Sequence, residues 1–277
     1  MDPASQLQSY TYPASPAELR ESIDSFLNEP PSSDLRAQTQ ERVRDSLEVI
    51  QKALDEYGPE GLALSYNGGK DCLVLLALYY SLIPPQPSPK STSPAAQLLP
   101  SPSIYVTPKH PFPQVESFVD ESAAAFGLEL IRIPVPMKAA FEDYLRRKTG
   151  VRAIMVGTRR GDPHGEGLRT CQRTDQGWPD FVRVHPVLEW RYAEVWEFLR
   201  ALQIPYCELY DQGYTSLGDV HDTHPNPALK RENGEEGFRP AWQLVDEDME
   251  RAGRGSDKKE RKAHENVKAG LVGKAEN

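Results

Sequence analysis

The residue types best suited to chemistry are concentrated in one short segment, Ser65-Tyr66-Asn67-Gly68-Gly69-Lys70-Asp71-Cys72. An apolar strand pattern precedes this segment and an apolar helix pattern follows it. Glycines let a backbone approach a ligand closely, and the first amide groups of a helix are unsatisfied and favour negative charge. Lys70 can add a positive charge. The pattern therefore predicts a phosphate-binding loop between a strand and a helix.

This segment differs from the two commonest glycine loops that bind phosphate. It lacks the G-x-x-x-x-G-K-[ST] spacing of the Walker loop and the G-x-G-x-x-G spacing of the dinucleotide turn. A plain strand-to-helix turn with two glycines is the structural alternative. The serine before the glycines and the Lys70-Asp71 pair after them favour phosphate binding over that alternative.

A second stretch, residues 154–190, is rich in side chains that bind charged or flat groups. Arginine grips phosphate with two hydrogen bonds, carboxylates bind Mg²⁺ or hydroxyl groups, and aromatic rings stack on flat heterocycles. The candidates are Arg159, Arg160, Arg169, Arg173, Arg183, Asp162, Asp175, Asp180, Trp178 and Phe181. Trp178 and Phe181 could equally be core residues, and Arg183 fits a surface ion pair better than a ligand contact. The histidines do not have the spacing of a zinc site.

The first segment, Ser65-x-Asn67-Gly-Gly-Lys-Asp71, resembles the PP-loop of the adenine nucleotide alpha hydrolases. Their PP-loop holds ATP phosphates in enzymes that cut ATP between its alpha and beta phosphates, and the nearest branch is the phosphoadenosine-phosphosulfate-reductase-like group. With the second stretch included, residues from about 40 to 254 resemble the fungal-type FAD synthases. The further runs that carry this resemblance are Gly157-Thr-Arg-Arg-Gly-Asp162-Pro163, Gln172-Arg-Thr-Asp175-Gln-Gly-Trp178-Pro-Asp180-Phe181, Tyr210–Gly218, Pro225-Asn226-Pro227, Arg239-Pro240-Ala-Trp242-x-Leu and Glu250-Arg251-Ala-Gly-Arg254.

The resemblance implies an FMN adenylyltransferase that moves AMP from ATP to FMN and releases FAD and pyrophosphate. The nucleophile would be the FMN phosphate, which is already ionised at neutral pH, so the reaction needs no general base. Catalysis would rest on in-line positioning and on neutralised charge. Mg²⁺ that bridges oxygens of ATP would supply part of that neutralisation.

The resemblance also implies a role for individual residues. The expected ATP- and phosphate-binding residues are Ser65, Tyr66, Gly68, Gly69, Lys70 and Arg159. The expected catalytic residues are Asn67, Asp71, Asp162, Arg251 and Arg254, with Asp71 and Asp162 as Mg²⁺ ligands. The expected flavin-binding residues are Asp175, Trp178, Asp180 and Phe181. Arg251 and Arg254 lie three residues apart and could share a helix face. We expect Asp71→Ala to lower turnover far more than stability, because Asp71 is assigned to the loop.

Three other classes of protein share parts of this pattern. A phosphoadenosine phosphosulfate reductase would carry its catalytic cysteine in a Glu-Cys-Gly-x-His setting, whereas Cys207, the last cysteine, lies in Pro-Tyr-Cys-Glu-Leu. A PP-loop ligase or thiolase that adenylates a carboxylate or a tRNA base is disfavoured by the acidic charge and by the Trp-Pro-Asp-Phe run. The intact Lys70-Asp71 pair disfavours a domain that only binds.

The elements that must position these residues follow from hydrophobic periodicity. Strand and helix patterns alternate, which predicts an α/β fold with a mostly parallel twisted sheet and helices on both faces. This fold class is the one that the PP-loop resemblance implies. Two N-terminal helices and an irregular C-terminal region complete it. The predicted strands are 61–66, 104–107, 128–133 and 152–157. The predicted helices are 16–29, 34–57, 73–83, 114–126, 137–148 and 189–202. No regular element is predicted within 158–186.

The domain organisation follows from loop and composition signals. We expect a flexible arm over residues 1–14 and a single adenylyltransferase domain over residues 15–254. Residues 84–103, rich in Pro and Ser, are interpreted as a surface insertion. Residues 255–277 are mostly polar and are expected to be disordered.

The composition of the chain disfavours some classes of binding partner. The chain has 277 residues and a net charge of −9, which disfavours a general nucleic-acid binder. Residues 131–191 are locally basic, which suggests a small anionic ligand. No apolar run is long enough to span a membrane, no secretory signal is recognised, and the cysteine count, 3, is odd. We expect a cytoplasmic enzyme that binds ATP, FMN and Mg²⁺; the oligomeric state stays open, with a monomer as the working expectation.

Overall fold

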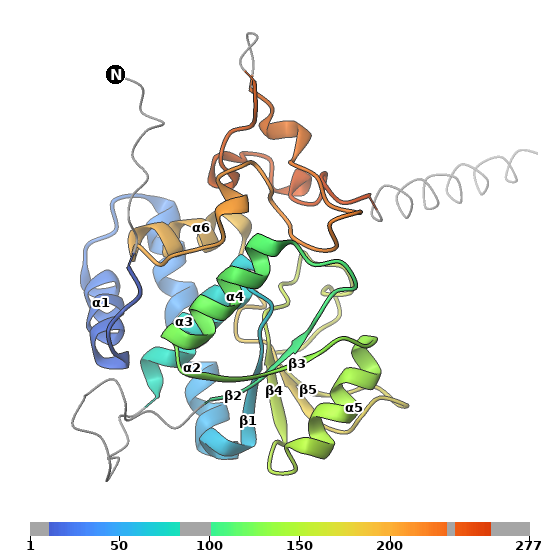
Figure 1. The fold of residues 1–277 in the computed structure, drawn as a ribbon. Helices are drawn as coiled ribbons and strands as arrows, with labels where there is room; N and C mark the ends of the chain where they lie inside the picture. The colour runs from blue at the N-terminus through green and yellow to red at the C-terminus, as the bar shows by residue number, and fades with distance from the viewer. Residues whose placement is uncertain (1–10, 84–100, 232–235, 256–277) are drawn as a thin grey trace, which may run out of the picture. The chain divides into compact units, whose positions relative to one another are not determined.

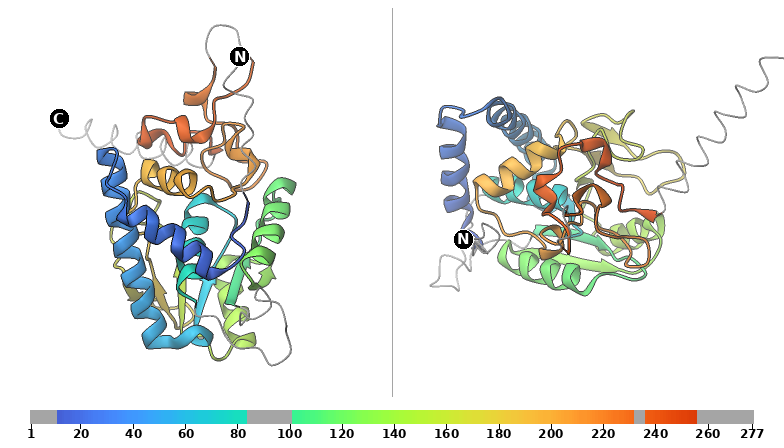
Figure 2. Two further views of the ribbon diagram at one scale, coloured as in Figure 1. Left: turned by 90° about the vertical axis from the view of Figure 1, so that its left-hand side faces the viewer. Right: turned by 90° about the horizontal axis from the view of Figure 1, so that it is seen from above.

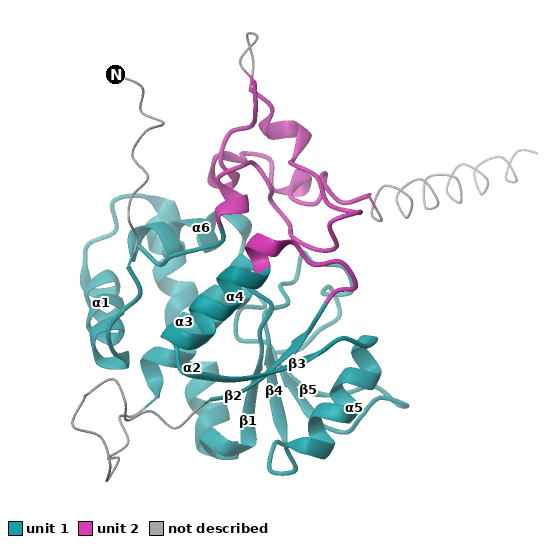
Figure 3. Ribbon diagram, in the orientation of Figure 1, with its two compact units in different colours: residues 1–107, 116–207 teal, residues 108–115, 208–277 magenta. Residues whose placement is uncertain are grey.

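The computed structural model describes residues 11–83, 101–231 and 236–255. The chain divides into two compact units (Figure 3). Unit 1 comprises residues 1–107 and 116–207, and unit 2 comprises residues 108–115 and 208–277. We describe each unit by itself, and the single domain expected over residues 15–254 stays a prediction. Most of the expected arm, insertion and tail lies outside the described residues.

Unit 1 is built on a six-stranded sheet with the strand order β3-β2-β1-β4-β6-β5 (Figure 1). The strands are β1 Leu62–Ser65, β2 Ser101–Val106, β3 Leu128–Ile133, β4 Ala153–Val156, β5 Cys171–Arg173 and β6 Val182–Val184. Every neighbouring pair is parallel except β5 with β6. The chain runs outward from β1 to β3 and then returns to the other side of β1 at β4. Ligands of open α/β sheets bind beyond the carboxyl ends of the strands at such a reversal, which here lies between β1 and β4.

Helices cover both faces of this sheet. They are α1 Pro16–Asn28, α2 Asp34–Gly61, α3 Lys70–Leu82, α4 Pro113–Ala125, α5 Met137–Arg147 and α6 Tyr192–Ala201. Helix α3 is apolar nearly all round, and its residues from Leu73 to Tyr80 are buried. Such a helix must be enclosed by other elements, and α3 contacts α1, α2 and α6. Figure 2 shows these outer helices in dark blue, blue and light orange.

The opposite face of the sheet packs on α5. Ala63 from β1, Ile104 from β2 and Ile154 from β4 form a buried cluster with Phe141 and Tyr144 of that helix. The alternation of side chains along each strand sends these residues to one face and their neighbours to the other. The core therefore has two layers, one on each side of β1 and β4, and it holds the carboxyl ends of these two strands in place.

The α/β fold class expected from the sequence is confirmed, whereas several expected boundaries are wrong. Strand β2 begins at Ser101, so the last three residues assigned to the insertion belong to the sheet. The stop predicted at Gly58-Pro59 is confirmed, because Gly58 has a non-helical φ of +69° that interrupts α2, and one further short helical stretch follows to Gly61. The stretch 158–186 contains β5 and β6. These strands have three residues each, too few to produce a recognisable period.

Unit 2 has little regular structure within its described residues. Its elements are the short 3₁₀ helices η3 Glu208–Tyr210, η4 Pro227–Leu229, η5 Ala241–Gln243 and η6 Glu247–Met249. Two isolated β-bridges join Thr223 to Arg254 and Lys230 to Phe238. The irregular C-terminal region expected from the sequence is thus confirmed for the residues described here. Across the described part of both units, no helix has the length and apolarity needed to cross a membrane.

Candidate active site

The predicted phosphate-binding loop lies where β1 ends and α3 begins. The backbone amide of Tyr66 donates to the carbonyl of Ile104 at 2.9 Å and so extends the pairing of β1 with β2. The amide of Gly69 donates to Oδ1 of Asn67 at 2.9 Å, which closes a turn within the loop. Gly68 has a φ of +73°, a conformation that glycine adopts without strain. Asn67 therefore holds the shape of the loop.

Strand β4 brings a second turn against this loop. Gly157 follows β4, and a Cβ atom at this position would lie 2.7 Å from Sγ of Cys72 in the first turn of α3. Only glycine permits so close an approach. Burial and the charge of Asp71 raise the pKa of Cys72 to about 12, so its thiol stays neutral. Cys72 therefore acts as a small packing residue.

Four charged side chains meet between the loop and the turn. Asp71 accepts a hydrogen bond from Nζ of Lys70 at 3.1 Å, and its other oxygen lies 3.0 Å from Nε of Arg159. Asp162 accepts a hydrogen bond from the backbone amide of Arg159 at 2.8 Å. The side chains of Lys70 and Arg159 are 2% and 5% exposed. The structure therefore assembles a cluster of two buried bases and two half-buried acids from residues that are about 90 positions apart in the sequence.

The two acids of this cluster have opposite pKa shifts. Burial alone would raise the pKa of Asp71, but the adjacent Arg159 and Lys70 hold that pKa below its usual value. Burial and repulsion by Asp71 raise the pKa of Asp162 despite the attraction of Arg159. Asp71 is thus fully compensated by positive charge, whereas Asp162 is the acid that a further cation would stabilise.

Two residues assigned to phosphate binding point into the protein. The ammonium group of Lys70 lies 5.2 Å from the centre of the Tyr192 ring, besides its contact with Asp71. The Tyr66 side chain is fully buried, and its hydroxyl group shares a hydrogen bond of 2.7 Å with Ser122. Lys70 therefore compensates Asp71 from within the protein, and Tyr66 presents only its backbone to the loop. Direct contact of either side chain with phosphate stays a prediction.

Three of the four residues assigned to flavin binding lie together in the loop of the β5–β6 hairpin. Trp178 is 40% exposed, and its backbone amide donates to the carbonyl of Asp175. Asp175 pairs with Arg183 at 3.2 Å, which places Arg183 in an ion pair as expected. Asp180 pairs with Arg173 at 2.7 Å. The loop thus presents an exposed indole between two exposed carboxylates.

The fourth residue, Phe181, has a different environment. Its side chain is 4% exposed and packs on Phe141 with ring centroids 5.1 Å apart. It belongs to the core cluster below α5. Its ring has no exposed face for a flavin, so we do not retain it as a stacking residue.

We expect Phe181→Leu to lower the free energy of unfolding by about 1–2 kcal/mol and to leave the KM for FMN unchanged, because it removes packing from the core. Trp178→Leu should have the reverse pattern, since Trp178 is exposed. Chemical denaturation and steady-state kinetics on both variants check this pair. A raised KM for FMN in Phe181→Leu, with stability preserved, would return Phe181 to the flavin site.

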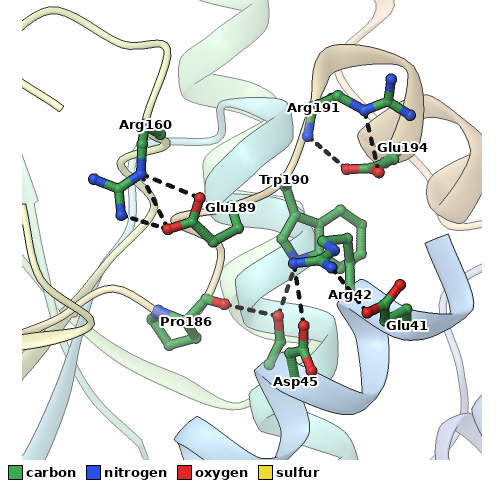
Figure 4. A network of polar contacts seen from close by, with 10 residues as sticks. Glu41, Arg42, Asp45, Arg160, Pro186, Glu189, Trp190, Arg191 and Glu194 are labelled. Carbon is green, nitrogen blue, oxygen red and sulfur yellow. Dashed lines mark hydrogen bonds and ion pairs between the residues drawn. The ribbon is translucent and has the colours of Figure 1, made fainter. Parts of the chain in front are cut away.

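Arg160 holds the turn that carries Arg159 and Asp162, a role that was not recognisable in the sequence. Its guanidinium pairs with both carboxylate oxygens of Glu189 (Figure 4). It also donates to the carbonyls of Glu166 and Leu168 at 2.7 and 3.1 Å. Glu189 is 29 positions away, and no local pattern links it to Arg160. The side chain of Arg160 therefore ties the residues after the turn to Glu189.

His185 contacts the backbone just before β5, which follows this turn in the sequence. Its side chain is buried, its Nδ1 lies 2.9 Å from the carbonyl oxygen of Arg169, and its backbone amide donates to Thr170. Burial and the charge of Arg183 lower the pKa of His185 below its usual value of 6.5. The folded protein therefore holds His185 neutral.

Acid should remove the stabilisation that His185 provides. The unfolded chain binds a proton on this residue more readily than the folded one, so stability falls as the pH drops through 6.5 towards the lower folded-state pKa. Denaturation of the wild type and of His185→Gln at pH 7.5, 6.5 and 5.5 measures this effect. The stability difference between the two proteins should shrink as the pH falls. A constant difference would contradict the assignment.

Arg251 and Arg254 belong to unit 2. Residues 251–253 form a turn after η6, and Arg254 forms the bridge with Thr223, so the expected shared helix face is wrong. The guanidinium of Arg254 donates to the carbonyl of Leu217 at 3.0 Å. Contacts with the loop residues Leu217 and Thr223 thus hold Arg254 in place. The spacing between the two arginines in the sequence cannot predict such contacts.

The geometry supports Asp162 as a Mg²⁺ ligand better than it supports Asp71. No group of three or more His, Cys, Asp or Glu side chains arranged to hold a metal occurs in the part of the chain that the structure describes. Both oxygens of Asp71 contact positive groups, whereas Asp162 has less positive charge around it. Mg²⁺ needs only one or two carboxylates when phosphates and water supply the remaining ligands. Asp162 fits that requirement better than Asp71, and both assignments stay predictions.

Comparison with known proteins identifies relatives over most of the chain. Residues 61–151 and 135–225 match the model of the phosphoadenosine phosphosulfate reductase domain. The chain is 43% identical to a probable FAD synthase of Schizosaccharomyces pombe over 231 residues, which are 83% of this chain and 84% of that protein. It is 33% identical to the flavin adenine dinucleotide synthase of Saccharomyces cerevisiae, over 81% of this chain and 79% of that one.

A solved structure extends this similarity to three dimensions. The crystal structure of Candida glabrata FMN adenylyltransferase in complex with FMN and the ATP analogue AMPCPP superimposes with a TM-score of 0.77. The two sequences are 31% identical, and the match covers 86% of this chain and 96% of that chain. Sequence and fold therefore agree on the same relatives.

Proposed function

The chain belongs to the FAD synthases, which are FMN adenylyltransferases within the phosphoadenosine phosphosulfate reductase domain family, and we propose that it makes FAD from FMN and ATP with the help of Mg²⁺. The observation that carries the proposal is the charged cluster of Lys70, Asp71, Arg159 and Asp162. It lies where the strand order reverses, beside a loop whose backbone amides suit phosphate.

In the proposed reaction an oxygen of the FMN phosphate forms a bond to the alpha phosphorus of ATP. The bond from that phosphorus to the bridging oxygen breaks, and its electron pair leaves with pyrophosphate. The amides of Gly68 and Lys70 bind the phosphates, Gly69 allows their close approach while its own amide donates to Asn67, and Ser65 and Arg159 lie beside them. Asn67 and Asp71 hold the loop in shape. Rate enhancement then comes from positioned reactants and from neutralised charge.

Arg251 and Arg254 supply further positive charge to the phosphates in this proposal. Their guanidinium groups stay charged at any pH at which the enzyme works. The reaction brings two anionic substrates together, and the four-residue cluster carries no net charge because its two acids offset its two bases. Additional cations are therefore needed, and these arginines, which belong to a run that resembles the FAD synthases, are the ones we assign.

Mg²⁺ would neutralise phosphate oxygens and stabilise the leaving pyrophosphate. Asp162 would hold it, because its carboxylate supplies the oxygen atoms that Mg²⁺ prefers as ligands. The pKa of Asp162 is raised in the protein, and a nearby cation would lower it. We do not retain Asp71 as a ligand, because Lys70 and Arg159 occupy both of its oxygens.

The β5–β6 hairpin loop would bind the isoalloxazine ring of FMN. The exposed indole of Trp178 offers a face for stacking. Asp175 and Asp180 offer acceptors for the ring NH and the ribityl hydroxyl groups. We further infer a cytoplasmic monomer with no nucleic-acid or membrane partner, which accords with the net charge of −9 and with three free cysteines.

The burial of the last cysteine in the sequence disfavours a reductase activity. Cys207 is 1% exposed, whereas a redox nucleophile must reach its substrate.

The test of the proposed function is a direct assay for FAD. Purified protein is incubated with FMN, ATP and Mg²⁺, and the flavins are separated by chromatography. We expect equal amounts of FAD and pyrophosphate, with no FAD when AMPCPP replaces ATP, because its bridge between the alpha and beta phosphates cannot be cleaved. Chelation by EDTA should stop the reaction. Bound ATP without any FAD would contradict the proposal and would leave the hairpin loop a structural feature.

A further inference from the structure

The buried amide side chain of Asn226 joins separate segments of unit 2. Its Nδ2 atom donates to Oγ1 of Thr215 at 2.8 Å and to the carbonyl of Met249 at 2.7 Å. Its Oδ1 atom accepts from the backbone amide of Ala228 at 2.9 Å. Asn226 is fully buried and Thr215 is 1% exposed. Both amide protons are therefore used in surroundings without solvent.

Thr215 extends this network to the next peptide. Its hydroxyl group donates to the carbonyl of Glu250 at 2.5 Å while it accepts from Asn226. The backbone amide of Asn226 also donates to the carbonyl of Gly213 at 2.8 Å. Removal of one partner from a buried and satisfied network leaves another polar group without its bond, and the loss is larger than for an exposed pair.

The network ends at the two residues that precede Arg251. The carbonyls of Met249 and Glu250 are both held from one side by the Asn226–Thr215 pair. Four residues further on, Arg254 bridges to Thr223 and donates to the carbonyl of Leu217. The segment 249–254 is thus anchored at both of its ends.

The residues that flank Asn226 reduce its freedom. Pro225 and Pro227 have fixed φ angles and no backbone N–H. Asn226 also caps η4 through its side chain. Asp at this position could not donate to the carbonyl of Met249, since an ionised carboxylate only accepts hydrogen bonds. Asparagine meets these requirements in full.

We propose that Asn226 is a positioning residue for FAD synthesis. Together with Thr215 it fixes the backbone from which Arg251 and Arg254 project, and it acts through these arginines rather than on the substrates. This inference rests on the proposed function and on the role assigned there to the two arginines. The inference also assigns a role to the Pro225-Asn226-Pro227 run, for which the sequence resemblance implied none.

The first experiment compares Asn226→Asp, Arg254→Ala and the double variant with the wild type. We expect Asn226→Asp to lower kcat by about tenfold or more, which corresponds to about 1.4 kcal/mol or more of lost transition-state stabilisation. In the Arg254→Ala background the same change should cost less, because one of the two arginines that Asn226 positions is already gone. A purely structural role would give additive losses.

The matched control is Gln40→Glu in unit 1. Gln40 is 4% exposed and its Nε2 donates to the carbonyls of Phe26 and Glu29 at 2.7 and 2.8 Å. The change removes the same kind of buried amide from a site that carries no assigned catalytic residue. It should lower the melting temperature and leave kcat unchanged at a temperature where the protein is folded.

A second pair of variants keeps the inference testable if Asn226→Asp does not fold. Thr215→Val removes the hydroxyl group at nearly constant volume, and Thr215→Ser restores it. We expect kcat to fall in Thr215→Val and to recover in Thr215→Ser.

The outcomes separate this inference from the function on which it rests. No FAD from the wild type would overturn the proposed function itself. Full activity in both Arg254→Ala and Arg251→Ala would overturn the role of the arginines. Loss of activity in those variants, together with wild-type kcat in Asn226→Asp and Thr215→Val, would overturn only the positioning role of Asn226. Equal losses of kcat in Gln40→Glu and Asn226→Asp would do the same.

Discussion

Asp71→Asn is expected to lower kcat by about 100-fold or more and also to lower the free energy of unfolding by about 3 kcal/mol. The stability loss follows from the buried charges that the variant leaves behind. Lys70 and Arg159 are 2% and 5% exposed and both contact the Asp71 carboxylate. The kcat loss follows because the same contacts hold the phosphate-binding loop against the turn after β4.

A double variant separates these two effects. Lys70→Met combined with Asp71→Asn removes one buried cation with its anion, so stability should recover in part. The kcat should stay low if the carboxylate is needed to position Arg159. Urea denaturation and the FAD assay on both proteins measure the two quantities. Recovery of kcat in parallel with stability would show that Asp71 only balances charge.

This result would differ from what the sequence alone predicts for Asp71. Its place in a glycine loop suggests a solvated residue whose removal spares stability. In the structure it lies in the first turn of α3 between two buried cations. Turnover and stability are therefore expected to fall together.

Asp162→Asn is expected to lower kcat by about 100-fold while the free energy of unfolding stays equal to that of the wild type or rises. The raised pKa of Asp162 means that its charged form is disfavoured in the folded protein, by burial and by repulsion from Asp71. A neutral amide relieves that cost. The variant should also need more Mg²⁺ for half-maximal turnover, because it lacks the proposed carboxylate ligand.

The measurement is a Mg²⁺ titration of FAD synthesis together with denaturation of the wild type and the variant. Asp24→Asn is the control, since Asp24 forms an exposed ion pair with Arg20 in α1. It should match the wild type in kcat, in Mg²⁺ requirement and nearly in stability. An unchanged Mg²⁺ requirement in Asp162→Asn would remove Asp162 from the metal site. A large stability loss would contradict its pKa direction.

The sequence alone determined the local units of this protein. The run from β1 through the glycine loop into α3 was recognisable because strand, turn and helix signals depend on neighbouring residues. The alternation of strands and helices likewise predicted a mostly parallel sheet, and the structure confirms it. The resemblance to FAD synthases rested on contiguous runs, and the comparisons confirm it as well.

Only the tertiary structure decided the environments of single residues. Lys70 and Phe181 have side chains that suit a ligand site, yet one compensates a buried carboxylate and the other lies in the core. The pairing of Arg160 with Glu189 and that of Asn226 with Thr215 and Met249 likewise arise where distant segments meet.

The physical reason lies in the range of the forces concerned. Helix and strand preferences act over a few residues, so they can be read along the chain. Burial, ion pairing and the resulting pKa shifts depend on every group within a few ångströms in space, and those groups come from positions that the sequence leaves far apart. The type of each site residue was therefore readable from the sequence, whereas the direction in which its side chain points was decided by the fold.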